Sequence, residues 1–526
     1  MSEKERLQKA IEATINTGYQ LSTDAFNYLL YCSKETDPLS IMNMVLHEMN
    51  TLKEKPFVIE KIFLENTVKQ LTQIHQAAQA VQNGNQKENT TLQPLKSLDV
   101  IVEGTFYPYA KHIPSELEIL EDATGKLTSN GTIEDYTALF QDRYKRLEKI
   151  LRKRIDVKSA TPIREALKAQ PKTKLKIIGM LTEKKNAKQQ TILTVEDLNN
   201  SATVLVPNNA LNEIKNKALQ ILPDQVICIA VTKTRTNLFL AEDIIFPDVE
   251  RKIPQRAQEA VYAVLTSDIH VGSTKFNKKA FKKFILWFKG KYGTPEMKEI
   301  AGRVKYLLIA GDIIDGIGVY PGQQHELTIR DAHKQYNHAI KYLGKIPKYV
   351  EIVLAPGNHD TTRKALPQPA IPSDYLTTIV DKSNIHSVGS PCLLNIHGVD
   401  ILMDHGRSLD DIVATIPEMS HDHPEKSMRL LLQGRHLAPV YGGKTLLAPE
   451  NRDYLVIDKV PDILHAGHVH VLGYCTYKGV LVVNSGGWQE QTEYMEKLGL
   501  VPTPGKVPVI NLMTMEITIL DFKTES

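Results

Sequence analysis

The stretch VEIVLAPGNHD, residues 350–360, indicates the fold of the C-terminal half of this chain. It begins with a short run of apolar, β-forming residues and ends in a glycine-containing turn that carries an amide, an imidazole and a carboxylate. A buried strand that ends in a polar turn is typical of open α/β sheets, which place their functional sites at the carboxyl ends of the strands. We therefore predict a strand over 350–354 and a site-forming turn directly after it.

The same arrangement occurs four more times along the chain. The polar sets are Asp268-Ile269-His270 after 261–266, Gly311-Asp312 with Asp315 after 304–309, His405-Gly406 after 399–403, and Gly467-His468-Val469-His470 after 463–464. Residues two apart on an extended segment point to one side, so Asp268 and His270 can bind one ion, as can His468 and His470. Carboxylate, imidazole and amide groups suit manganese, iron or zinc rather than a thiolate site. These motifs together predict a shared two-metal centre.

The 526 residues exceed what one hydrophobic core usually holds, so the chain is expected to be multidomain. Helical periodicity near the N-terminus, a polar linker at 82–91, a helix at 133–154 and alternating strands with one helix after 170 suggest the boundaries. The predicted parts are a small helical N-terminal module at 1–75, a linker and connecting helical region at 76–170, an OB-like β-barrel at 171–250, and an α/β sandwich at 257–526.

Composition places few limits on the partners. The 64 basic and 61 acidic residues give a net charge of only +3, so any contact with nucleic acid has to come from local patches. The basic run from Arg143 to Arg154 is one candidate, although a solvated helix face is the more common meaning of such a run. The cysteines form no CxxC pair, and the chain shows neither a secretory signal nor a long apolar stretch. We therefore expect a reducing, intracellular setting and no membrane partner.

The order DxH, GDxxD, GNHD, H and GHxH across residues 260–490 resembles the calcineurin-like metallophosphoesterases. This resemblance implies a two-layered sheet sandwich flanked by helices, with two divalent ions bound at one edge. It implies that one ion is bound by Asp268, His270 and His470, and the other by Asn358, His405 and His468. Asp312 would bridge the ions, and His359 would be the catalytic histidine that binds neither.

Four longer stretches are similar to the small subunit of archaeal family D DNA polymerase. They are VYPGQ at 319–323, HGRSLDD at 405–411, RHLAP with YG at 435–442, and NSGGWQ at 484–489. This resemblance implies a 3'-5' proofreading exonuclease that acts on single-stranded DNA 3' ends in the cytoplasm of an archaeal cell, at the nucleoid. Arg407 is then a candidate substrate-binding residue. Manganese is the expected metal, with iron, zinc or magnesium as alternatives.

The chain contains no recognisable polymerase palm pattern, so the resemblance assigns DNA synthesis to a large catalytic subunit, with a sliding clamp as a further candidate partner. Two other functions stay open. One is a non-catalytic scaffold like the accessory subunits of eukaryotic replicative polymerases, whose metal ligands have been lost, whereas every ligand position is filled here. The other is a stand-alone phosphoesterase that acts on protein phosphate or a cyclic nucleotide, against which the barrel and the N-terminal module argue.

Overall fold

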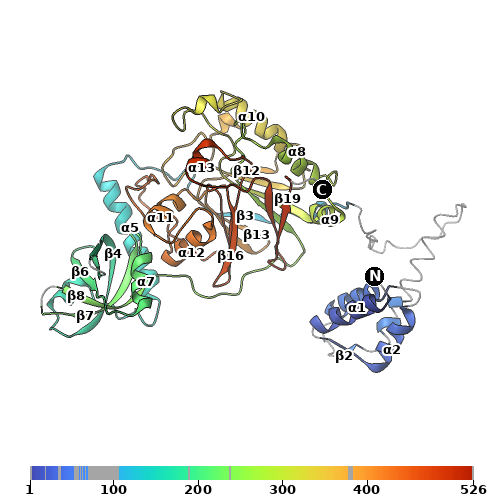
Figure 1. Ribbon diagram of the computed structural model, residues 1–526, viewed down its shortest axis with the longest axis horizontal. Coiled ribbons are helices and arrows are strands. Elements are labelled where there is room, and N and C mark those ends of the chain that lie inside the picture. Colours follow the sequence, from blue (N-terminus) through green and yellow to red (C-terminus); the bar gives the residue numbers. More distant parts are fainter. Residues whose placement is uncertain are drawn as a thin grey trace, which may run out of the picture. The chain divides into compact units, whose positions relative to one another are not determined.

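The computed structural model describes residues 3–68 and 106–523, apart from gaps at 18, 34–36, 52–57, 60, 62, 66, 188–189, 236–237 and 377–382. The chain divides into two compact units, Met1–Asp99 and Val100–Ser526, which are described separately (Figure 1). The expectation of a multidomain chain is therefore confirmed. The polar linker predicted at 82–91 lies outside the described residues.

The N-terminal unit is mainly helical. Its elements are α1 (Glu3–Asn16), α2 (Thr23–Cys32), α3 (Pro38–Thr51) and a parallel pair formed by β1 (Gln20–Leu21) and β2 (Val58–Ile59). The Ser22 side chain accepts a hydrogen bond from Ala25 N at 3.2 Å, which satisfies one of the free amides at the start of α2. Apolar side chains such as Leu29 and Ile41 are fully buried between the helices and form a small core of their own.

The second unit contains a closed five-stranded barrel, shown in green in Figure 1. Its strands are β4 (Lys174–Ala187), β5 (Gln190–Glu196), β6 (Ser201–Val206), β7 (Val226–Lys233) and β8 (Leu238–Ile245), in the order β4-β5-β6-β8-β7. Strand β6 illustrates why these residues form a barrel strand, because its alternate residues Ala202, Val204 and Val206 are buried in the barrel core. Helix α7 (Asn212–Gln220) follows β6. The predicted barrel is confirmed, and its OB-like assignment stays a prediction.

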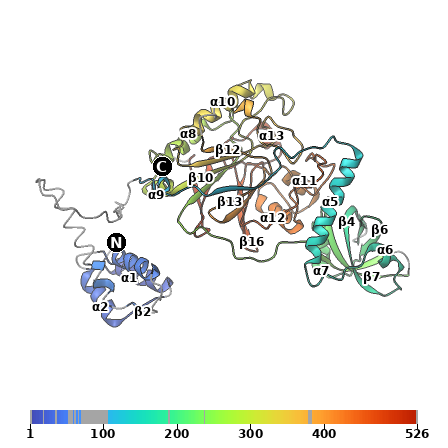
Figure 2. The ribbon, with the colours of Figure 1, turned by 180° about the vertical axis from the view of Figure 1, so that it is seen from behind.

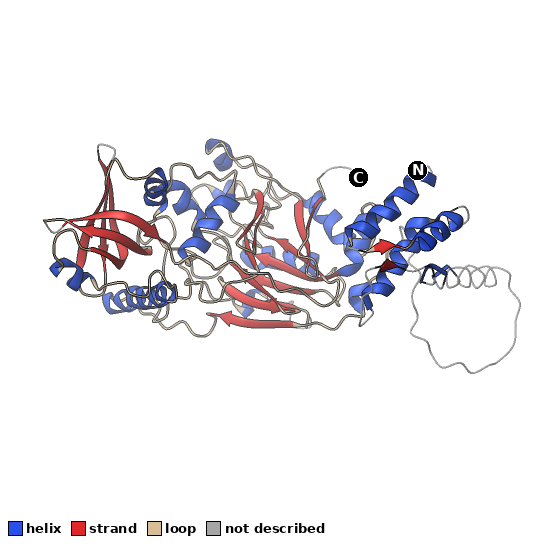
Figure 3. Ribbon diagram, turned by 90° about the horizontal axis from the view of Figure 1, so that it is seen from below, coloured by secondary structure: helices blue, strands red, loops and turns tan. Residues whose placement is uncertain are grey.

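Two six-stranded sheets form the rest of the unit. The first has the order β12-β11-β10-β9-β18-β19, with β9 (Tyr262–Thr266), β10 (Val304–Ala310), β11 (Glu351–Ala355), β12 (Ile385–Ser387), β18 (Lys506–Asn511) and β19 (Ile517–Asp521). The second has the order β16-β17-β15-β14-β13-β3, with β3 (Leu117–Asp122), β13 (Cys392–Ile396), β14 (Val399–Met403), β15 (Ile463–Ala466), β16 (Leu472–Tyr477) and β17 (Val480–Ser485). In Figure 3 the barrel strands and the sheet strands form separate red groups.

Alternation along the strands explains how the sheets and helices pack. In β10, Tyr306 and Leu308 contribute to a core shared with the second sheet, whereas Leu307 and Ile309 pack in a core with helical residues. The helices on that side are α8 (Lys278–Trp287), α9 (Pro295–Arg303) and α10 (Ala332–Leu343). The second sheet shares its other core with α11 (Leu409–Thr415) and α12 (Pro424–Gly434), while α13 (Glu493–Lys497) follows β17. The arrangement is helix, sheet, sheet, helix.

The sequence predicts only a linker and connecting helical region before the barrel, and this segment also contains a strand. Strand β3 pairs antiparallel with β13 at the edge of the second sheet. Its sequence LEILED carries three charged side chains, which suits an edge strand, so its apolar signal is weak. The predicted helix is α5 (Ile133–Arg152), which lies next to the barrel in Figures 1 and 2, and α6 (Ile163–Lys168) follows it. No helix in the described residues is long and apolar enough to span a membrane.

Candidate metal centre

The predicted site residues come together because both sheets direct the carboxyl ends of their strands to one place. The first sheet supplies the residues that follow β9, β10 and β11, and the second supplies those that follow β14 and β15. Two groups of side chains each have ligand atoms within 4.8 Å of one another: Asp268, His270 and His470, and Asp312, His405 and His468. Residues from five separate strand ends therefore converge on a single centre.

Asp312 lies between the two groups. Its Oδ1 atom accepts a hydrogen bond from His359 N at 2.7 Å, which fixes the carboxylate. Its Oδ2 atom lies 3.3 Å from His405 Nε2 and 3.7 Å from His270 Nε2. One oxygen atom is thus within reach of both ligand groups, as a bridging carboxylate requires.

In the first group, hydrogen-bond acceptor atoms lie close together, and some of them have no hydrogen-bond donor in the part of the chain that the structure describes. His470 Nε2 lies 3.2 Å from His270 Nε2 and 3.4 Å from Asp268 Oδ1. Among the described residues, Asp268 Oδ1 and His470 Nδ1 are buried and find no hydrogen-bond partner. Buried polar atoms are normally paired, so an unpaired carboxylate oxygen beside two imidazoles fits a cation-binding site.

In the second group, hydrogen bonds outside the site orient the ligands. His405 Nδ1 lies 2.8 Å from the carbonyl oxygen of Ala310, so this nitrogen carries a proton and Nε2 faces the centre. His405 Nε2 lies 3.0 Å from Asn358 Oδ1. His468 Nε2 instead lies 3.2 Å from Asp410 Oδ2, a contact that the sequence analysis did not predict.

His359 lies beside both groups. Its Nδ1 atom lies 2.7 Å from the carbonyl oxygen of Asp315 and therefore donates to it, which leaves Nε2 as the nitrogen available to a substrate or ion. His359 also forms a third close group with His270 and Asp315. Burial lowers the pKa of His359, although the charge of Asp312 opposes that effect.

Asp360 holds the turn that carries Asn358 and His359. Its carboxylate accepts hydrogen bonds from Gly357 N at 2.9 Å and from the Tyr336 hydroxyl at 2.8 Å. Burial raises the pKa of Asp360 to about 6, and the nearby charge of Asp312 adds to this effect. Gly357 cannot be replaced without movement, because a Cβ there would lie 2.2 Å from Asp312 Oδ1.

The backbone of the predicted ligands is unusual. Five of them have positive φ angles: Asp268 at 50°, His270 at 51°, Asp312 at 53°, His468 at 73° and His470 at 58°. This left-handed conformation costs about 1–2 kcal/mol for a residue with a Cβ atom. Such conformations persist where the surrounding structure enforces them, and they cluster at functional sites.

The carboxylates give the centre a field that favours positive charge. Burial alone would lower the pKa of His270 and of His405, but neighbouring aspartates raise these values to about 10 and about 9. Asp268 and Asp315 act on His270, and Asp312 acts on His405. A field that holds protons on imidazoles also favours a divalent cation in their place.

Asp315 is a functional residue to which the sequence analysis gave no role. Its Oδ1 atom lies 3.0 Å from His270 Nδ1 and accepts a further hydrogen bond from Gln489 Nε2 at 3.2 Å. The carboxylate therefore fixes the ring of His270 with Nε2 toward the centre. Its place in the GDxxD motif was visible in the sequence, but which histidine it contacts depends on the fold.

Arg407, the predicted substrate-binding residue, lies beside the second ligand group. Its Nη1 atom donates to Asp410 Oδ2 at 2.6 Å and lies 3.1 Å from His468 Nε2. His421 Nε2 lies 3.0 Å from the other oxygen of Asp410. The structure thus brings together all the predicted site residues, with Asp410 as an additional carboxylate at the edge.

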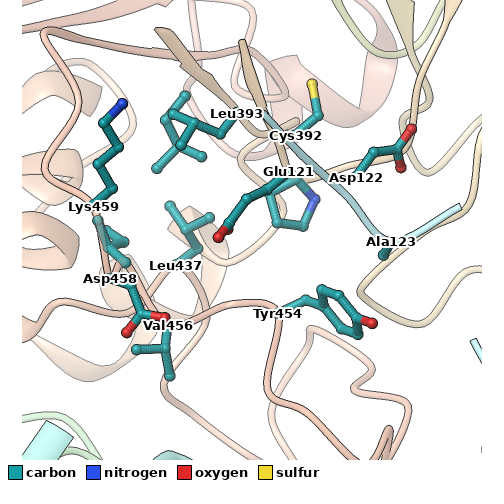
Figure 4. A pocket seen from close by; sticks show the side chains of 13 residues that line it. Glu121, Asp122, Ala123, Cys392, Leu393, Leu437, Tyr454, Val456, Asp458 and Lys459 are labelled. Atoms are coloured by element: carbon teal, nitrogen blue, oxygen red, sulfur yellow. The ribbon is translucent and has the colours of Figure 1, made fainter. Parts of the chain in front are cut away.

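One small, partly open pocket lies away from these residues. It has a volume of about 20 Å³, is lined by residues from β3, β13 and the segment 454–459, and includes none of the predicted site residues (Figure 4). A space of this size holds about one water molecule.

The chain is similar to one family model and to solved structures. The family model for the B subunits of DNA polymerases alpha and epsilon matches residues 263–471, the segment that carries every predicted ligand. Among solved structures, one described as a novel archaeal phosphodiesterase is similar over 49% of this chain and 99% of its own length. Its sequence identity is 16% and its TM-score is 0.25.

Curated relatives define the family. The DNA polymerase II small subunit of Methanocaldococcus jannaschii is 40% identical over 77% of this chain and 68% of its own length. The protein of the same name from Pyrococcus furiosus is 40% identical over 74% of this chain and 64% of its own length. The chain belongs to the family of small subunits of archaeal DNA polymerase II, the family D polymerase. It spans about two thirds of the length of these two relatives.

Proposed function

We propose that this chain is the 3'-5' proofreading exonuclease of its polymerase and hydrolyses DNA phosphodiesters at a two-metal centre. The observation that carries this proposal is the buried centre in which Asp312 Oδ2 faces both His270 and His405 while Asp268 Oδ1 has no hydrogen-bond donor among the described residues. A scaffold subunit has no need for such a set of converging, unpaired ligand atoms. Family membership supplies the DNA substrate, and the polarity is an inference from proofreading.

The residues present fit two divalent ions, with manganese as the expected metal and iron, zinc or magnesium as alternatives. Asp268, His270 and His470 would bind one ion, Asn358, His405 and His468 the other, and Asp312 both. Ions bound there would polarise the phosphodiester and neutralise the charge that develops on it. The chain's own contribution is to fix the ligands, because Asp315 and the Ala310 carbonyl orient His270 and His405.

His359 is the proposed catalytic residue. The carbonyl of Asp315 accepts from Nδ1 and leaves Nε2 facing the site. Burial lowers the pKa of His359 and the charge of Asp312 opposes this effect, and in its doubly protonated form His359 would give the Nε2 proton to the departing 3' oxygen. The same group would stabilise negative charge on the phosphate before that transfer. Arg407, held by Asp410, is placed to contact a phosphate on the side of the second ligand group.

A proofreading subunit needs a source of 3' ends, and the relatives are named as the small subunit of a DNA polymerase. We therefore propose a large catalytic subunit as the partner, with a sliding clamp as a further candidate. Native purification should return the chain together with a polymerase, whereas recovery of the chain alone would count against the heteromer. An OB-like barrel would serve as a docking module or as a contact for single-stranded DNA.

The direct test is a nuclease assay on the full chain with manganese and single-stranded oligonucleotides. We expect shortening from the 3' end, no cleavage when that end is blocked, and no cleavage after chelation. Equal cleavage of blocked and free oligonucleotides into internal fragments would contradict the exonuclease assignment. No cleavage at all would favour the scaffold, and a preference for small phosphoesters would favour a stand-alone phosphoesterase.

His359→Ala separates chemistry from metal binding. Loss of a general acid costs about 100-fold to 10,000-fold in rate, so single-turnover cleavage should fall by that amount. Bound metal, measured by elemental analysis, and DNA affinity, measured by fluorescence anisotropy, should change little, because the lost interaction is strongest in the transition state. Loss of the metals, or cleavage at the wild-type rate, would show that His359 has a different role.

A further inference from the structure

The loop at residues 316–322 lies directly against the proposed catalytic turn. It follows Asp315 and begins at Gly316, where an added Cβ atom would lie 2.3 Å from the carbonyl oxygen of His359. The loop backbone and the turn that carries His359 are therefore in van der Waals contact. A substrate phosphate placed at His359 would have this loop as one wall.

Buried hydrogen bonds fix this loop. The Gln323 side chain is buried, and its Nε2 atom donates to the carbonyl oxygen of Asp315 at 2.7 Å and to Asp315 Oδ2 at 3.1 Å. Its Oε1 atom accepts from Val319 N at 2.9 Å. One side chain thus ties the middle of the loop to the residue that orients His270 and His359.

Tyr320 presents an aromatic ring at this wall. Its ring centroid lies 6.3 Å from that of His359, at an interplanar angle of 63°. Its hydroxyl donates to Glu326 Oε2 at 3.0 Å, so the ring is fixed from its far end. Within the described residues, Tyr320 is half-buried and belongs to none of the hydrophobic cores, whereas its neighbour Ile317 is 50% exposed.

A fixed aromatic ring that adds nothing to a core and touches the catalytic histidine is suited to binding a flat ligand. Every nucleobase offers a π face, and stacking on an aromatic side chain tolerates all four bases. Proofreading requires this tolerance, because the terminal nucleotide can be any of the four. An unpaired terminal base is free to leave its neighbours, whereas a paired one has to be unstacked first.

We propose that Tyr320 stacks on the base of the 3'-terminal nucleotide and so positions the last phosphodiester beside His359, with Ile317 covering the base from the same loop. This inference rests on the proposed exonuclease function. It assigns the site a substrate feature, an unstacked terminal base, and assigns the VYPGQ segment a role.

The test compares wild type, Tyr320→Ala and Tyr320→Phe on two oligonucleotides that differ only in the last nucleotide, which is normal in one and abasic in the other. Stacking on an aromatic side chain is worth about 5-fold to 100-fold per base, so kcat/KM of Tyr320→Ala on the normal end should fall by that factor. Its value on the abasic end should equal that of wild type, and Tyr320→Phe should match wild type on both. The ratio of the two substrates within one preparation does not depend on the fraction of folded protein.

Equal losses of Tyr320→Ala on both substrates, or equal losses in Tyr320→Phe and Tyr320→Ala, would overturn the inference and leave the exonuclease intact. Tyr477→Ala is the matched control, because the Tyr477 hydroxyl also donates to a carboxylate, Asp248 at 3.0 Å, from a strand outside the site. It should leave the ratio of normal to abasic cleavage unchanged.

A binding measurement distinguishes the proposed base site from the proposed exonuclease activity. An oligonucleotide with 2-aminopurine as its last base, joined by a phosphorothioate linkage that slows cleavage, should lose fluorescence when the base stacks on wild-type protein. Tyr320→Ala should abolish this quenching. Quenching without any nuclease activity would support the base site and reject the exonuclease, whereas equal quenching in wild type and Tyr320→Ala would reject the base site.

Discussion

Two buried clusters in this chain both contain histidine and aspartate and are built differently. One is the metal centre. The other, the α5 cluster, consists of Arg143 on helix α5 with His436 and Asp453, all buried. In it, Asp453 Oδ2 accepts from Arg143 Nε at 2.7 Å and from His436 Nε2 at 2.8 Å.

The clusters differ in how completely their histidines and carboxylates are paired. Both ring nitrogens of His436 have protein partners, because Nδ1 accepts from Ala438 N at 3.1 Å, and Asp453 Oδ1 accepts from Leu455 N at 3.0 Å. In the metal centre, Asp268 Oδ1 and His470 Nδ1 have none among the described residues. The two clusters thus share buried histidine and aspartate, and they differ in whether a buried carboxylate oxygen is left without a hydrogen-bond partner.

The largest expected effect comes from Asp312→Ala, which removes the oxygen shared by both ligand groups. Metal binding should be lost, and cleavage should fall by at least about 1,000-fold, because bound metal contributes several kcal/mol to the barrier. In wild type, manganese should raise Tm by selective binding to the folded state, and in Asp312→Ala it should not. A variant that keeps its metal-dependent rise in Tm would remove Asp312 from the centre.

Asp453→Ala should instead lower the stability of the fold and leave metal binding unchanged. It leaves the buried guanidinium of Arg143 without its carboxylate, and breaking a buried pair costs about 3–5 kcal/mol. Denaturant unfolding should show that loss, while the rise in Tm with manganese persists. Asp458→Ala is the matched control, because Asp458 is 41% exposed and its pairs with Arg146 and Arg452 lie at the surface, so its loss should cost below about 1 kcal/mol. Equal losses in the two variants would mean that the α5 cluster is not a structural pair.

The pH dependence of stability should report His436. Burial, together with the charge of Arg143, lowers the pKa of His436 to about 4 from an ordinary value of 6.5. The unfolded chain therefore binds this proton first, and the stabilisation present above pH 6.5 is lost as pH falls toward 4, by about 3 kcal/mol in full. Urea unfolding between pH 7 and pH 4 should show a shallower loss in His436→Gln than in wild type. Parallel curves would contradict the assignment.

The smallest effect is expected from Asp315→Asn. The amide keeps the shape but removes the charge behind His270, and such changes typically weaken metal affinity by about 10-fold to 100-fold. Titration calorimetry with manganese measures this directly. The control is Glu351→Gln, which changes a carboxylate 2.8 Å from His386 Nε2, outside the centre, and should leave affinity unchanged. An unchanged affinity in Asp315→Asn would limit its role to holding the loop.

The strands and the ligand residues could be predicted because both are local signals. An apolar run such as 304–309 forms a buried strand wherever it lies, and ligand types at several strand ends meet once the sheets form. Strand β3 was not predicted, because its charged side chains suit an edge strand and leave little apolar signal.

The side-chain contacts between residues far apart in the sequence could not be predicted from the sequence. Arg143 belongs to a basic run that favoured a solvated helix face, and it is in fact fully buried. Its partner Asp453 lies 310 residues further along the chain, so nothing nearby in the sequence marks the pair. For the same reason, the contact of His468 with Asp410 appears only in the fold.

The left-handed backbone of the five ligand residues has a consequence for how this site would decay. At each position glycine would adopt the positive φ angle without the backbone cost that the aspartate or histidine bears. The need for a ligand side chain therefore adds backbone strain at each of these five positions. In a descendant released from catalysis, selection for folding alone would favour glycine or asparagine at positions 268, 270, 312, 468 and 470. After a loss of activity, the first substitutions would therefore be those that relieve the backbone strain at these positions.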